Sequence, residues 1–166
     1  MSANKYLQHV FVLPEDDANR QIANGFFLAL ATGQYQRQFN ILETAGGWNE
    51  VLVRFNSSYA ADMDIIPTRF MVLLIDFDNH LDRLEQARNR IPRHLHDRVF
   101  ILGALGEPES LRRDLGSYEE IGLAMARDCR EGTDTVWSHP HLQHNTQEIA
   151  RLRHQICNFL FPPPVN

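Results

Sequence analysis

Acidic residues occur in two groups whose types and spacing could hold a divalent cation. One group follows a short apolar segment near the start of the chain, and the other follows the most apolar segment, residues 70–75. The acids are Glu15, Asp16, Asp17, Asp76 and Asp78. Like charges that lie close together raise each other's pKa, and a hard cation with oxygen ligands relieves that repulsion. We therefore predict a Mg²⁺ or Mn²⁺ site, against the alternative that these acids are solvated helix caps.

Two further groups of side chains have types that bind metals. His139, His141 and His144 lie within one short segment, and pairs of them could reach one transition metal. They match no fixed metal-ligand spacing, so we interpret them as structural. Cys129 and Cys157 have no CxxC spacing, and we expect two buried reduced thiols rather than a disulfide or zinc ligands.

Apolar periodicity predicts the elements that position these side chains. Strands are expected at residues 9–13, 39–42, 70–75 and 98–102. Helices are expected at residues 18–31, 49–55, 81–91, 108–115, 117–129 and 145–160. Ser117 and Glu120 have the spacing of a capping box. Strands that alternate with helices indicate a three-layer α/β sandwich with roughly four parallel strands, followed by a helical C-terminal addition.

The chain is expected to form one domain over residues 1–166. Its parts are a core, a helical addition and a frayed tail, at residues 8–106, 107–161 and 162–166. In open parallel sheets, ligands bind beyond the carboxyl ends of the strands. The two acidic groups follow the first and third predicted strands, so we expect them to converge there. Asp76 and Asp78 would point to the same face of a continuing strand.

This arrangement resembles the Toprim domain of topoisomerases, primases, recombination proteins and OLD-type nucleases. The resemblance covers residues 8–106 and includes the Gly46-Gly47 turn after the second strand. Matched position by position, Glu15 corresponds to the family's glutamate, and Asp76 and Asp78 correspond to its Asp-x-Asp pair. The resemblance implies Mg²⁺-supported phosphodiester chemistry, with Glu15 as a ligand or general acid/base and both aspartates as metal ligands.

Two positions depart from that pattern, because Asp16 and Asn19 stand where the family commonly has Gly and Asp. The resemblance leaves two functions open. One is a nuclease-like hydrolase that binds DNA or RNA through metal-bridged phosphates. The other is a non-catalytic assembly module that works with a partner protein such as an ATPase, and an oligomer is compatible with either.

The same acids also fit two other patterns of phosphoryl chemistry. A receiver domain would bind Mg²⁺ through Asp16 and Asp17 beside Asp76 as phosphoacceptor, but receivers need a later lysine and the sequence has only Lys5. A HAD-type phosphatase would use Asp76 as nucleophile and Asp78 as proton donor, and it needs a later lysine too. We keep the receiver as the second alternative.

Composition excludes several classes of protein. The net charge of −5 argues against a protein that coats nucleic acid through bulk positive potential. The longest apolar run is too short to span a bilayer, and the first ten residues lack the apolar region of a signal peptide. We therefore expect a cytoplasmic protein with no membrane contact. Arg83 and its neighbours alternate with acids, which favours a solvated, ion-paired helix face. Trp48 is expected to be a partly buried loop aromatic.

Overall fold

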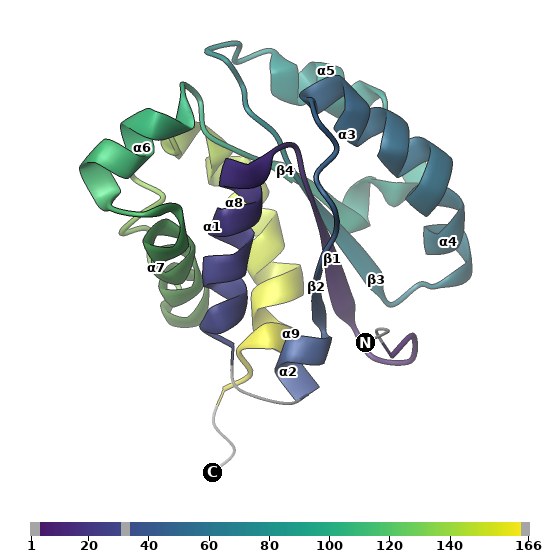
Figure 1. The fold of residues 1–166 in the computed structure, drawn as a ribbon. Helices are drawn as coiled ribbons and strands as arrows, with labels where there is room; N and C mark the ends of the chain where they lie inside the picture. Colours follow the sequence, from purple (N-terminus) through teal and green to yellow (C-terminus); the bar gives the residue numbers. More distant parts are fainter. Residues whose placement is uncertain (1–3, 31–33, 164–166) are drawn as a thin grey trace.

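The structure is a computed structural model that describes residues 4–30 and 34–163. A parallel sheet of four strands forms its centre (Figure 1). The strands are β1 (His9–Pro14), β2 (Phe39–Ile41), β3 (Arg69–Leu74) and β4 (Val99–Leu102), in the spatial order β2-β1-β3-β4. All neighbouring strands pair in parallel. The predicted α/β fold is therefore confirmed.

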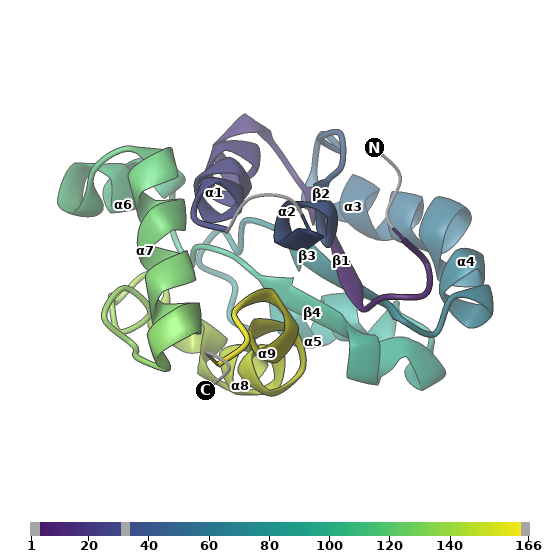
Figure 2. The ribbon, with the colours of Figure 1, turned by 90° about the horizontal axis from the view of Figure 1, so that it is seen from below.

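Helices cover both faces of this sheet (Figures 1 and 2). One face carries α3 (Trp48–Arg54), η1 (Phe55–Tyr59), α4 (Ala60–Ile65) and α5 (Arg83–Asn89). The other carries α1 (Asp17–Leu28), α8 (Thr146–Leu152), η4 (Arg153–Cys157) and α9 (Asn158–Leu160), while α7 (Tyr118–Glu131) packs against α1 rather than on the sheet. Connections contain α2 (Gln34–Arg37), η2 (Arg93–Arg98), α6 (Pro108–Leu115) and η3 (Gln143–Asn145). Ala31, the last residue of the predicted helix 18–31, and residues 164–166 of the predicted tail lie outside the described residues.

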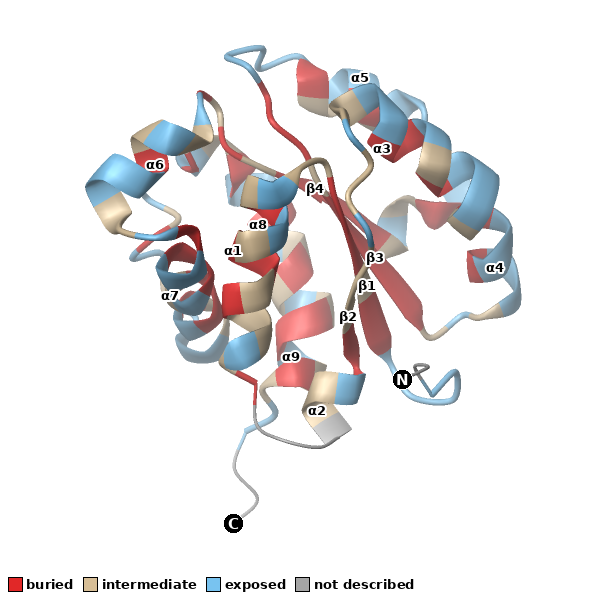
Figure 3. Ribbon diagram, viewed as in Figure 1, coloured by how far each residue is buried: buried red, intermediate tan, exposed pale blue. Residues whose placement is uncertain are grey.

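Two apolar cores form because successive residues of a strand point to opposite faces of the sheet. The core under α3 and α5 contains Leu13, Leu73, Ile101, Phe55 and Ala87. The core under α1 and α8 contains Val12, Val72, Phe100, Ala23 and Ile149. The strands are buried over most of their length (Figure 3), which explains why residues 70–75 form a continuous apolar run.

The helical addition packs on the core through close backbone contact between α1 and α7. A Cβ atom at Gly25 would lie 2.0 Å from the carbonyl oxygen of Glu119, so only glycine fits there. The predicted capping box begins α7: Ser117 Oγ accepts from Glu120 N at 3.1 Å, and Ser117 N donates to Glu120 Oε2 at 2.9 Å. That part of the prediction is confirmed.

Side chains from η3 and α8 cover the outer edge of β4. Asn145 Oδ1 accepts from Gly103 N at 3.2 Å, and its Nδ2 donates to Gly103 O at 2.9 Å. Glu148, 1% exposed, accepts from Ile101 N at 3.0 Å. An open strand edge is a template for further pairing, so these two side chains take the place of a fifth strand.

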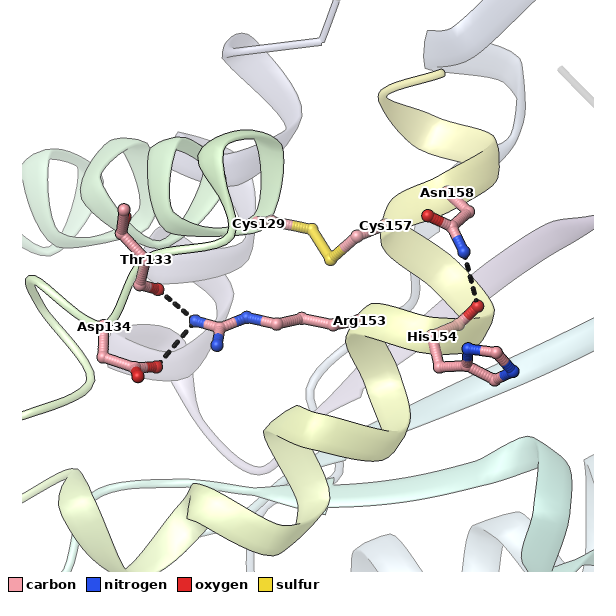
Figure 4. The surroundings of a disulfide bond; sticks show 7 residues. All are labelled: Cys129, Thr133, Asp134, Arg153, His154, Cys157 and Asn158. Carbon is pink, nitrogen blue, oxygen red and sulfur yellow. Dashed lines mark hydrogen bonds and ion pairs between the residues drawn. A yellow bond between two sulfur atoms is a disulfide. The ribbon is translucent and has the colours of Figure 1, made fainter. Parts of the chain in front are cut away.

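A disulfide joins Cys129 of α7 to Cys157 of η4 (Figure 4), so the prediction of two reduced thiols is wrong. The two Cα atoms are 5.5 Å apart although the cysteines are separated by 28 positions. Arg153 strengthens the same junction: it donates to the carbonyl oxygen of Thr133 and pairs with Asp134 at 2.8 Å. The pairing depends on how α7 packs against the last helix, which the spacing of the cysteines does not encode.

The largest difference in secondary structure lies before β3. The helix predicted at residues 49–55 continues from α3 through the π-helical turn η1 into α4 and ends at Ile65. Within the described part of the chain, no helix is long and apolar enough to cross a membrane.

Candidate functional site

The carboxyl ends of β1 and β3 meet where the direction of the connections reverses. β1 leads through α1 to β2 on one side, and β3 leads through α5 to β4 on the other. Open parallel sheets bind ligands in the crevice outside such a switch point. Pro14 and Leu74 are the last paired residues, so Glu15 and the residues from Ile75 onward leave the sheet side by side.

A buried asparagine connects the acids of β1 and β3. Asp16 is the N-cap of α1, and its Oδ1 accepts from Asn19 N at 3.0 Å and from Asn19 Nδ2 at 3.1 Å. The same Nδ2 also donates to Asp76 Oδ1 at 3.3 Å, and Asn19 is 3% exposed. One amide group thus fixes the carboxyls of Asp16 and Asp76 relative to each other.

Glu15 reaches the same place from the end of β1. Its Oε2 accepts from the backbone N–H of Asp76 at 2.7 Å, and its own N–H donates to Leu74 O at 2.8 Å. The predicted convergence of the acids at this edge therefore occurs for Glu15, Asp16 and Asp76.

The surroundings strongly disfavour a charge on Asp76. Burial, followed by the charges of Asp16 and Glu15 and a hydrogen bond with the Asp16 carboxyl, raises the pKa of Asp76 to about 7. Burial likewise raises the pKa of Glu15, and the charges of Asp16 and Asp78 add to that effect. These carboxyls repel one another in a poorly solvated crevice.

Asp78, the third predicted ligand, turns away from this group. Asp78 and Asn79 both have left-handed backbone conformations, with φ of 48° and 61°. Asp and Asn tolerate this region better than most residues, and the turn that they form ends the strand direction on which the prediction of a shared face depended. The Asp78 carboxylate instead accepts from Arg83 Nη1 at 2.7 Å.

Arg83 is the site residue whose role the sequence concealed. It was expected on a solvated face, which is wrong, because Arg83 is 9% exposed. It also donates to the carbonyl oxygen of Asp76 at 2.8 Å, and its guanidinium lies 4.6 Å from the centre of the Trp48 ring. Trp48 is partly buried, as expected, but it begins α3 and does not lie in a loop as predicted. The only available signal was the position of Arg83 shortly after the Asp-x-Asp pair.

The acid pair of the receiver pattern is only half assembled. Asp16 shares the Asn19 amide with Asp76, but Asp17 is exposed and binds Arg20 at 2.6 Å and Gln21 at 2.6 Å on the surface of α1. Lys5 precedes β1 and therefore lies toward the amino end of the strands, away from the carboxyl edge.

The rings of His139 and His141 stack on each other, with centres 5.6 Å apart, whereas His144 has a different ring as its neighbour. His139 Nε2 lies 3.0 Å from Asp114 Oδ2, and His139 Nδ1 accepts from the backbone N–H of His141 at 3.1 Å. The ring of His144 packs edge-on against Phe77, with ring centres 4.7 Å apart. Burial lowers the pKa of His144.

The acids at the switch point fit Mg²⁺ as a pair of carboxylates. Among the residues that the structure describes, no three His, Cys, Asp or Glu side chains form a group that could hold a metal ion. Mg²⁺, however, commonly takes one or two carboxylates from the protein and completes its shell with waters and substrate phosphates. Asp76 with Glu15 or Asp16 supplies such hard oxygen donors, and a cation would relieve the repulsion that raises the pKa of Asp76.

Comparisons with protein-family models, with curated proteins and with solved structures each returned no match for this chain. The functional argument therefore depends on the geometry of the site itself.

Proposed function

We propose that this chain is a Toprim-like, Mg²⁺- or Mn²⁺-dependent protein that acts on the phosphodiesters of DNA or RNA. The observation that carries the proposal is the group of Glu15, Asp16 and Asp76 at the switch point, where the pKa of the buried Asp76 is about 7. Among the described residues, the carboxyl of Asp76 has no cationic partner. A strongly perturbed carboxyl in a ligand-binding crevice is a mark of a functional site.

Each residue has a role that its contacts support. Glu15 and Asp76 are the proposed carboxylate ligands, and Asn19 orients Asp76 against Asp16. Because the pKa of Asp76 lies near neutrality, the Asp16–Asp76 pair can hold or release a proton at physiological pH. The bound cation would supply charge stabilisation at the phosphoryl oxygens of the substrate.

A cleavage assay tests this proposal. Metal-free protein is incubated with labelled single- and double-stranded DNA and RNA oligonucleotides, with and without Mg²⁺ or Mn²⁺. We expect cation-dependent cleavage that falls by roughly a hundredfold or more in Asp76→Asn, because that change removes a proposed metal ligand. Asp17→Asn is the matched control, since Asp17 is the neighbouring acid that faces solvent.

Cation binding without cleavage of any of these substrates would contradict the enzymatic part of the proposal. It would favour the assembly module, in which Asp76→Asn changes neither the partner protein nor the oligomeric state. Equal cleavage by the wild type and Asp76→Asn would contradict the assignment of the site.

One observation favours a second candidate, the receiver-like phosphoacceptor. Asn19 Nδ2 donates to the carboxyls of both Asp16 and Asp76, at 3.1 Å and 3.3 Å, so one acid of the receiver pair lies close to the proposed acceptor. Incubation with acetyl phosphate and Mg²⁺, followed by mass spectrometry, separates the two functions. A receiver gains the mass of one phosphoryl group on Asp76, whereas the protein proposed here gains none.

A further inference from the structure

Arg83, the first residue of α5, brings a buried positive charge to the edge that holds the acids. Its Nη1 donates to both the Asp76 carbonyl oxygen and the Asp78 carboxylate, at 2.8 Å and 2.7 Å. Its Nε is buried and has no hydrogen-bond partner in the described structure. A buried donor without a partner is unfavourable, so a movement of this side chain can gain a hydrogen bond.

The Trp48 ring supports the guanidinium from its other side. Its centre lies 4.6 Å from the guanidinium carbon, a cation–π distance. Burial raises the pKa of Glu15, and the Arg83 charge opposes that rise. Arg83 is therefore within electrostatic reach of the acids on both β1 and β3.

Asp78 is the more exposed partner of this ion pair. Its side chain is 60% exposed, while that of Arg83 is 11% exposed. Arg83 holds it in the left-handed turn, at a point where its charge still raises the pKa of Glu15. Asp78 is thus close to the acid group, and its carboxylate is directed to Arg83.

We propose that Arg83 is a built-in counter-ion for Asp78 that a divalent cation displaces, so that Asp78 joins Glu15 and Asp76 only when the cation is bound. The inference rests on the proposed function, because it presupposes a cation at Glu15 and Asp76. A dication attracts a third carboxylate more strongly than one guanidinium does. The released guanidinium then pairs with a phosphate oxygen of the substrate, for which its planar donors are suited.

Trp48 fluorescence reports the displacement directly. The sequence has two tryptophans, so Trp137→Phe leaves Trp48 as the sole emitter. We expect Mg²⁺ to change the Trp48 emission as the guanidinium leaves the ring. The change should saturate at the Mg²⁺ concentration at which calorimetry shows binding.

Calorimetric titration of Arg83 variants tests the competition. Arg83→Gln removes the counter-ion, so we expect Mg²⁺ to bind about tenfold more tightly, without the change in Trp48 emission. This gain should vanish when Asp78→Asn is added. Arg83→Lys keeps a competing charge and should show no gain. Arg90→Gln is the matched control, because Arg90 is exposed at the other end of α5.

The outcomes separate this inference from the proposed function. If neither the wild type nor Arg83→Gln binds Mg²⁺, the proposed function is wrong and the inference fails with it. If both bind equally, or if Arg83→Gln binds more weakly, the proposed role of Arg83 as a counter-ion is wrong, and the proposed cation site still holds. If Arg83→Gln does not fold, Asp78→Asn decides: the inference requires about tenfold weaker binding and no Trp48 response, and wild-type behaviour overturns it.

Discussion

The two ends of the central sheet treat buried charge in opposite ways. At the amino end, His9 is fully buried, and both ring nitrogens have partners. Its Nδ1 lies 2.8 Å from Leu7 O, and its Nε2 accepts from Arg69 Nε at 3.1 Å, which fixes a neutral ring with the proton on Nδ1. The Arg69 guanidinium lies 4.0 Å from the centre of the Phe11 ring.

At the carboxyl end, the buried carboxyl of Asp76 has two acids and one amide around it. The buried polar groups of the amino end therefore have all their partners within the folded chain. The repulsion between the acids of the carboxyl end is relieved only by a proton or a cation. Strongly perturbed carboxyls are more frequent at functional sites than elsewhere, so the contrast between the two ends supports the site that we propose at the carboxyl end.

The two ends also give opposite pH dependence to folding. The pKa of Asp76 is raised to about 7 in the folded state. Between the ordinary pKa of Asp and pH 7, the folded state therefore binds more protons than the unfolded state, and stability falls as the pH rises. Burial lowers the pKa of His9, with the Arg69 charge contributing, so the unfolded state binds more protons and stability falls as pH drops below about 6.5.

The largest expected effect comes from a perturbation away from both ends. Removing the disulfide with Cys129→Ala and Cys157→Ala should lower the free energy of unfolding by about 3.5 kcal/mol, because the cross-link closes a long loop of the unfolded chain. Urea unfolding measures this, and reduced wild type is the control. Both pH effects should persist in the variant. Their loss would show that the comparison reflects the integrity of the fold rather than the two ends.

The next effect belongs to the amino end. Arg69→Met leaves His9 Nε2 buried without a donor and removes the contact with Phe11, so we expect a loss of about 2–3 kcal/mol in the free energy of unfolding. Mg²⁺ affinity should stay within about twofold of the wild type, since the change is at the other end of the strands. Exposed Arg37→Met is the control. A large loss of Mg²⁺ affinity in Arg69→Met would break the comparison.

The carboxyl end should behave in the reverse way. Asp76→Asn cannot ionise, so at pH 8 without divalent cations it should be more stable than the wild type by roughly 1–3 kcal/mol, and near pH 3, below the ordinary pKa of Asp, the difference should vanish. Thermal unfolding at both pH values measures this. A destabilised Asp76→Asn at pH 8 would mean that Asp76 is a structural residue like His9.

The smallest expected effect concerns the loss of stability at acid pH, which we call the acid limb of the stability profile. His9→Gln keeps a donor and an acceptor but does not titrate, so the loss of stability below about pH 6.5 should become shallower than in the wild type. Comparing Tm values between pH 7 and pH 5 measures the slope. An unchanged slope would assign the acid limb to other groups.

The sequence predicted the framework of the site better than its electrostatics. Local apolar patterns mark the buried strands and show that acids follow β1 and β3. The parallel sheet and the proximity of Glu15 to Asp76 could therefore be predicted from the sequence. The position of Asp78 depends on two left-handed residues, and the burial of Arg83 depends on Trp48 from another element. Such contacts between distant segments have no local pattern, and the same is true of the disulfide.

The most direct test is a calorimetric titration of metal-free protein with Mg²⁺ at pH 7 in buffers of different ionisation enthalpy, with Asp76→Asn in parallel. We predict one saturable site in the wild type, release of protons on binding because burial and the neighbouring acids raise the pKa of Asp76 to about 7, and no binding by Asp76→Asn. Absence of binding by the wild type, or equal binding by both proteins, would contradict the proposed cation site.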